Sequence, residues 1–133
     1  MEMYVKNEHS FTLKKEIRNT AFPVIGEVTA EQIEDIVVNA LECQSNYWVG
    51  VDNTTPEWEN KPQGLPVSQY AVQLLLQNKS VKLFDIEDED EEWKLTLGKL
   101  LNGIGKAWAE GCDIEDDADT VLQYALFDKL VYG

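Results

Sequence analysis

The sequence predicts a single α+β domain, with about four helices packed on a small antiparallel sheet that includes a hairpin. Two observations support this fold class: several segments carry apolar residues at helical spacing, and shorter segments between them are rich in β-branched and aromatic residues. The length of 133 residues and the 44% hydrophobic content suit one domain, residues 1–133, with a packed core. Within it, segment 1–28 carries few structural signals, and 29–133 is the readable part.

The clearest helix signal is the stretch 29–41, TAEQIEDIVVNAL. Thr29 suits an N-cap, and Gln32 stands three residues later, as a capping box requires. Apolar residues then recur on one face at Ile33, Ile36, Val37, Ala40 and Leu41. We expect this helix to be central to the core.

The segments around this helix give weaker signals. Before it, residues 11–17 alternate as in a strand, and Pro23 and Gly26 are expected to break the chain. After it, 46–51 reads as a buried strand, and 52–66 reads as a long loop in which Trp58 folds back on the core. A second helix is expected to begin near Pro66 and to end at Asn78.

The second half of the chain predicts a hairpin followed by two helices. Segments 81–85 and 93–97 read as its strands, joined by the acidic run 87–92 as a solvated tip. Thr96 suits the N-cap of a third helix, in which Gly98, Gly103 and Gly105 permit the close approach of another element. The fourth helix carries an apolar stripe from Ala118 to Val131, so we expect the end of the chain to be docked.

The chain is strongly acidic, with 25 Asp and Glu against 11 Lys and Arg and a net charge of −14. This balance argues against direct binding to nucleic acid or to an anionic membrane, because both need clustered basic residues. A solvated, self-repelling surface explains such a charge, and so does a face for a basic partner. The expected acidic contact face comprises Glu87, Asp88, Glu89, Asp90, Glu91, Glu92, Asp113, Glu115, Asp116, Asp117 and Asp119.

No motif predicts a catalytic residue, a metal site or a cofactor. The only histidine is His9, and the sequence lacks GxSxG, HExxH and CxxC patterns. Loops beginning at Asp85 or Asp113 do not meet the EF-hand spacing for calcium. Cys43 and Cys112 are expected to be reduced thiols, because no secretory signal is recognised. We therefore expect the cytoplasm as the location.

Aromatic residues offer a second hypothesis for function. Tyr47, Trp48 and Trp58 are typical of core positions, but three such rings facing one cleft would form a pocket for a small molecule or a nucleotide.

Three stretches, taken together and in order, resemble a family of small acidic proteins encoded by bacteriophages and prophages. They are TAEQIEDIVVNALE with NYW, VKLFD with EEWKLTLGKLLNGI, and DADTVLQYALFDKLVYG, and they cover about residues 29–133. The resemblance implies phage origin but no activity. The chain departs from the family pattern at Cys43-Gln44-Ser45 and near Asp128, where relatives tend to have glycine.

The leading hypothesis is a non-enzymatic phage accessory protein that contacts another protein, such as a host protein with a basic surface. A small-molecule or nucleotide binder and an enzyme of unfamiliar type stay open as alternatives. The apolar fourth helix also predicts a homodimer, because one small core covers only part of such a surface.

Overall fold

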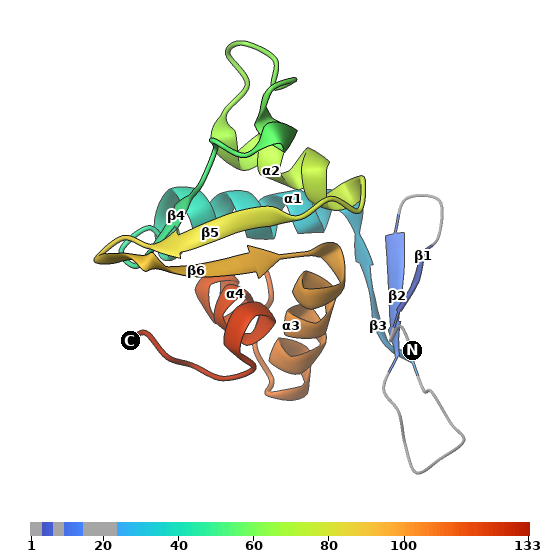
Figure 1. Cartoon of the computed structure of the whole chain (residues 1–133). Helices are drawn as coiled ribbons and strands as arrows, with labels where there is room; N and C mark the ends of the chain where they lie inside the picture. Colours follow the sequence, from blue (N-terminus) through green and yellow to red (C-terminus); the bar gives the residue numbers. More distant parts are fainter. Residues whose placement is uncertain (1–3, 7–9, 15–23) are drawn as a thin grey trace.

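The computed structural model describes residues 4–6, 10–14 and 24–133, which fold into two three-stranded antiparallel sheets and four α-helices (Figure 1). The α+β prediction is therefore confirmed, although it placed all strands in one sheet. The first sheet comprises β1 (Tyr4–Lys6), β2 (Ser10–Lys14) and β3 (Val24–Thr29). The second comprises β4 (Val49–Val51), β5 (Val81–Asp85) and β6 (Asp88–Leu95). The helices are α1 (Ala30–Asn39), α2 (Val67–Leu76), α3 (Leu97–Ala109) and α4 (Ala118–Phe127).

Helix α1 begins where the sequence predicts. The Thr29 hydroxyl accepts a hydrogen bond from the backbone N–H of Gln32 at 3.1 Å, and the Thr29 N–H donates to the Gln32 side chain at 2.9 Å. The backbone N–H groups of Thr29 and Gln32 are thereby both satisfied. Ile33, Ile36 and Val37 are buried, and a π-helical turn, Ala40–Gln44, continues the helix. Helix α1 thus lies at the centre of the core.

The strand that leads into α1 differs from the prediction of a chain break. Strand β3 runs directly into the helix and includes Gly26. A Cβ atom on Gly26 would lie 2.7 Å from the ring of Trp108 in α3, so the glycine serves close packing rather than a turn. Of the predicted strand 11–17, residues 11–14 belong to β2, and the remaining three lie outside the described residues.

The second sheet carries most of its apolar side chains on one face. Val81 pairs with Leu95 and Leu83 with Trp93, and Val81, Leu83 and Leu95 are buried against the helices. The opposite face carries Phe84, whose ring lies so close to Gly50 of β4 that a Cβ there would be 2.5 Å away. One face of this sheet therefore belongs to the core, and the other is open.

The hairpin differs from the prediction at both ends of its second strand, which ends at Leu95 because Leu97 already begins α3. Its turn is short, Ile86–Glu87, and the acidic residues 88–92 form the first part of β6 instead of a loop. Side chains 87–92 are nevertheless exposed, as the sequence predicts.

Helices α3 and α4 pair closely, below β6 in Figure 1. A Cβ on Gly103 of α3 would lie 2.5 Å from the backbone oxygen of Val121 in α4, so the predicted close approach is present at this glycine. Helix α4 ends at Asp128, which adopts a left-handed conformation with φ of 61°. Beyond it, residues 128–133 form an extended segment, here called the tail, in which Leu130 and Val131 are exposed instead of extending the buried stripe.

Candidate functional site

The strongest surface feature is the acidic part of β6 with the turn before it. All six side chains, Glu87 to Glu92, are exposed. Among the described residues the ion pairs are Lys82 with Glu92 (3.0 Å), Lys82 with Asp52 (3.5 Å) and Lys106 with Asp128 (3.2 Å). Five of these six acids therefore carry charge with no ion-pair partner in the described part of the chain. Such a strand edge attracts cations and repels another acidic chain.

The second acidic cluster divides into an outer and an inner part. Asp113, Glu115 and Asp116 are exposed, and the Asp113 carboxylate accepts the backbone N–H groups of the other two at 3.1 and 3.3 Å. Asp117 turns back and accepts the N–H of Asp113 at 3.1 Å. Asp119 points into the molecule. Only the outer part of this cluster is available as a charged face.

Asp119 joins three elements of the fold through its carboxylate. Its Oδ1 accepts hydrogen bonds from the Ser45 hydroxyl at 2.6 Å and from the Trp48 indole N–H at 2.8 Å. Its Oδ2 accepts from the Tyr47 hydroxyl at 3.1 Å and from the Gln123 amide at 3.0 Å. Ser45, Trp48 and Gln123 are buried, so this carboxylate satisfies donors that would otherwise lack a partner. Its role is structural.

The predicted aromatic residues lie in two separate places. The Trp48 ring is stacked on Tyr132 of the tail, with centroids 4.5 Å apart and planes at 10°, and it contacts Trp93 and Phe127. Trp58 packs against Tyr70 of α2 at 5.1 Å, as a buried lid of the kind predicted for its loop. The structure therefore brings Tyr47 and Trp48 together, while Trp58 belongs to another cluster.

A small cavity of about 160 Å³ lies beside Tyr47 and Trp48. It is lined by Tyr47, Trp48, Asp85, Glu87, Tyr132 and Gly133. The Tyr132 hydroxyl donates to the Asp85 carboxylate at 2.6 Å, and burial together with this acceptor raises the pKa of Tyr132 to about 12. The same hydrogen bond is the main reason why the pKa of Asp85 is lowered. The cavity is smaller than most small-molecule sites, which reach about 300 Å³ or more.

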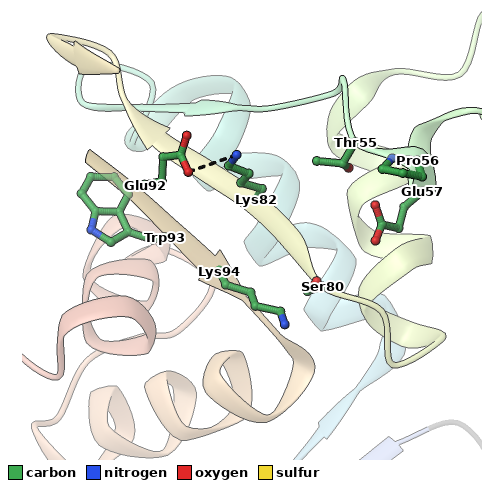
Figure 2. A pocket seen from close by; sticks show the side chains of 8 residues that line it. All are labelled: Thr55, Pro56, Glu57, Ser80, Lys82, Glu92, Trp93 and Lys94. Atoms are coloured by element: carbon green, nitrogen blue, oxygen red, sulfur yellow. Dashed lines mark ion pairs between the residues drawn. The ribbon is translucent and has the colours of Figure 1, made fainter. Parts of the chain in front are cut away.

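A larger cavity of about 410 Å³ lies on the open face of the second sheet, beside the loop that contains Pro56 (Figure 2). It is lined by Thr55, Pro56, Glu57, Ser80, Lys82, Glu92, Trp93 and Lys94. Lys82 and Lys94 are paired across β5 and β6, so they share this face, and Figure 2 shows Lys82 turned toward Glu92. The alternating charged residues of β5 and β6 could have predicted this face from the sequence. The contribution of residues 55–57 could not have been predicted, because it depends on long-range folding.

Several ionisable side chains, in these cavities and elsewhere, have a pKa shifted from its usual value. The hydrogen bond to Glu92 is the main reason why the pKa of Lys82 is raised. Hydrogen bonds from Thr54 lower the pKa of Asp52, and a backbone hydrogen bond is the first cause that lowers that of Glu57. Burial raises the pKa of the Cys112 thiol and of the Tyr47 hydroxyl. Each of these shifts moves the group away from proton exchange at neutral pH.

The remaining residues considered in the sequence are His9, Cys43 and Cys112. His9 lies outside the described residues. Cys43 is exposed and Cys112 is partly buried, and both are free thiols. Within the described ranges no group of three or more His, Cys, Asp or Glu side chains is arranged to hold a metal ion. The buried polar side chains of those ranges are Ser45, Ser68 and Gln123, so no carboxylate is fully buried there. None of the described helices combines the length and the apolar character needed to cross a membrane.

Comparison with known proteins finds no matching family model, no matching curated protein and no matching solved structure.

Proposed function

We propose that this chain is a phage-encoded accessory protein that works by contact with another protein and catalyses no reaction. The contact is made by the acidic surface, here meaning Glu87 to Glu92 with the outer acids Asp113, Glu115 and Asp116. Its partner carries a basic surface, such as that of a host protein in the bacterial cytoplasm. The homodimer and the phage origin expected from the sequence are part of this proposal.

One observation carries the proposal: the turn before β6 and the bulged first part of that strand expose acids that have almost no counter-charges. Glu92 is paired with Lys82, but the carboxylates of Glu87 to Glu91 have no ion-pair partner among the described residues. Carboxylates arranged in this way speed the approach of a basic partner and disfavour acidic ones. The net charge of −14 extends the attraction beyond the contact itself.

The proposal is tested by capture from a bacterial lysate with a matched variant. The variant Glu89→Gln, Asp90→Asn, Glu91→Gln removes three charges without changing side-chain size. We expect the wild type, immobilised at low salt, to retain a basic protein that the variant retains much less. Equal capture by both would contradict the proposal.

A small-ligand binder remains the second candidate because of the cavity of about 410 Å³ on the open sheet face. That volume lies within the range of small-molecule sites, about 300 to 1,000 Å³. Thermal unfolding with added nucleotides and divalent metals tests it, because a bound ligand raises the unfolding temperature. No shift with any of them would leave the protein-contact proposal as the better one.

A further inference from the structure

Four large hydrophobic side chains are exposed in the described part of the chain. They are Tyr47, Ile86, Leu130 and Val131, with exposed fractions of 46%, 44%, 56% and 50%. They come from three segments that are far apart in sequence: the chain before β4, the turn between β5 and β6, and the tail. Scattered exposed apolar residues need no explanation, but a group of them does.

Contacts among the three segments bring Tyr47, Ile86 and the end of the tail to one region. The Ile86 N–H donates to the backbone oxygen of Trp48 at 3.1 Å, which fixes the turn beside Tyr47. Tyr132 of the tail stacks on Trp48 and bonds Asp85, the residue before Ile86. Figure 1 shows the tail running from the end of α4 toward the β5–β6 turn. We call the four exposed side chains the tail patch.

The tail is held in place by a buried side chain. The Gln123 amide oxygen accepts the backbone N–H groups of Val131 at 2.7 Å and Tyr132 at 2.9 Å, and its nitrogen donates to the Tyr132 oxygen at 3.0 Å. Gln123 is only 1% exposed, so these bonds are shielded from water. The apolar side chains are therefore presented on a pre-organised backbone, which lowers the entropy cost of binding.

The surroundings of the tail patch are acidic. Glu87 follows Ile86 and is exposed. The Asp128 side chain at the start of the tail is 90% exposed, although it is paired with Lys106 at 3.2 Å. Glu87 and Glu91 both help to raise the pKa of Tyr132, which indicates that their charges lie close to the tail. Lys129 is the cation that the tail itself contributes. An apolar centre with an acidic rim is complementary to an apolar segment flanked by Lys or Arg.

We infer that the tail patch is the docking surface for a protein segment in which apolar side chains alternate with, or are flanked by, basic ones. This inference rests on the proposed function and adds an apolar centre to its acidic contact. A second copy of this chain would bind less well, because its acidic rim would face the identical acidic rim of the first copy. An anionic membrane is repelled for the same reason.

The test uses three synthetic peptides of equal length as probes, titrated into the full chain and followed by calorimetry and amide NMR shifts. One alternates Lys with Leu, the second Lys with Ser, and the third Glu with Leu. We expect the Lys/Leu peptide to bind at least about tenfold more tightly than the Lys/Ser peptide, because it also buries apolar area. The largest shifts should fall at Tyr47, Ile86 and the tail. The Glu/Leu peptide should not bind.

A triple variant, Ile86→Ser, Leu130→Ser and Val131→Ser, removes three of the four apolar side chains of the tail patch and keeps every acid. It should lose about tenfold in affinity for the Lys/Leu peptide and none for the Lys/Ser peptide. Leu65→Ser, in the loop before α2, is the control and should bind as the wild type does. Thermal unfolding and amide dispersion verify that each variant is folded.

The outcomes separate this inference from the proposed function. Equal affinity of wild type and triple variant for the Lys/Leu peptide overturns the inference. The Lys/Leu and Lys/Ser peptides could also bind equally well and lose binding only when Glu89, Asp90 and Glu91 are neutralised. That result overturns the inference but supports the acidic contact. Binding of the Glu/Leu peptide, or a dimer formed through the tail patch at low salt, overturns the assigned partner chemistry. Failure of both basic peptides to bind overturns both proposals.

Discussion

At the residue scale, Asp119 shows that a member of an acidic run can serve the fold instead of the surface. Its carboxylate accepts hydrogen bonds from Ser45, Tyr47, Trp48 and Gln123. Three of its four hydrogen-bond donors lie more than 70 residues earlier in the chain. Nothing in the local sequence therefore distinguishes Asp119 from its exposed neighbour Asp116. Its role is a product of the tertiary fold.

We predict that Asp119→Ala lowers the free energy of unfolding by about 3 kcal/mol, because buried donors on Ser45 and Trp48 lose a charged acceptor. Asp116→Ala is the control. The Asp116 side chain is exposed, so the same substitution should change stability by less than about 0.5 kcal/mol. Urea unfolding measures both. Equal losses for the two variants would contradict the structural role of Asp119.

A second prediction concerns Tyr132 and alkaline pH. Burial and the Asp85 carboxylate raise its pKa from 10.0 to about 12, so the folded state favours the protonated phenol. The stability that this provides is complete below pH 10.0 and is lost as pH rises through about 12. The difference in unfolding free energy between the wild type and Tyr132→Phe should therefore shift in favour of the variant over this interval. A constant difference would show that the phenol titrates normally.

At the element scale, the pairing of α3 with α4 depends on one glycine. Gly103→Ala should destabilise the protein by about 1 to 3 kcal/mol, because its Cβ would lie 2.5 Å from the Val121 oxygen. A Cβ at Gly98 in the same helix would meet only the Thr96 hydroxyl, at 3.9 Å. Gly98→Ala should therefore stabilise the protein by up to about 1 kcal/mol, because alanine has the higher helix propensity. Thermal unfolding compares the two. A gain in stability with both substitutions would exclude the close contact.

The elements could be predicted from sequence where local signals and tertiary packing agree. Thr29 and Gln32 form the capping box that their spacing predicts, and Thr96 caps α3. The sequence predicts a solvated tip at residues 88–92 because unpaired carboxylates are costly to bury. The structure keeps these side chains exposed but places the residues in β6, where Asp88 and Glu92 pair with β5. Strands β1 and β3 had no clear pattern of their own.

The candidate site could be predicted only in part. Charge and exposure follow from composition, so the acidic side chains 87–92 were correctly expected to be exposed. The stacking of Trp48 on Tyr132 joins residues from the two ends of the readable region, and no local pattern signals it. The sequence predicts that Trp58 folds back on the core, and Trp58 is buried, but no local pattern identifies Tyr70 as its partner. Long-range contacts of this kind leave little trace in one sequence.

At the scale of the whole molecule, unbalanced charge is the dominant property. We predict that Glu89→Gln, Asp90→Asn, Glu91→Gln leaves the free energy of unfolding unchanged or raises it by up to about 1 kcal/mol, because like-charge repulsion falls. Urea unfolding at low salt measures this, and added salt should reduce the difference. A loss above about 1 kcal/mol would mean that these carboxylates are paired or hold a cation.

The same charge governs self-association. A homodimer must bring two acidic surfaces together, so its population should rise with salt. Light scattering at low and high salt follows the mass. A monomer at micromolar concentration in both conditions would contradict the dimer.

The central claim is that this protein acts through an acidic contact with a basic partner. The most direct test is the salt dependence of the affinity between the purified chain and the protein that it captures from a lysate. We predict that the affinity falls at least about tenfold between about 50 and 300 mM salt, and that the fall is smaller for the variant with Glu89, Asp90 and Glu91 neutralised. An affinity that does not change with salt would contradict the claim. So would an equal change in affinity for the wild type and for the variant.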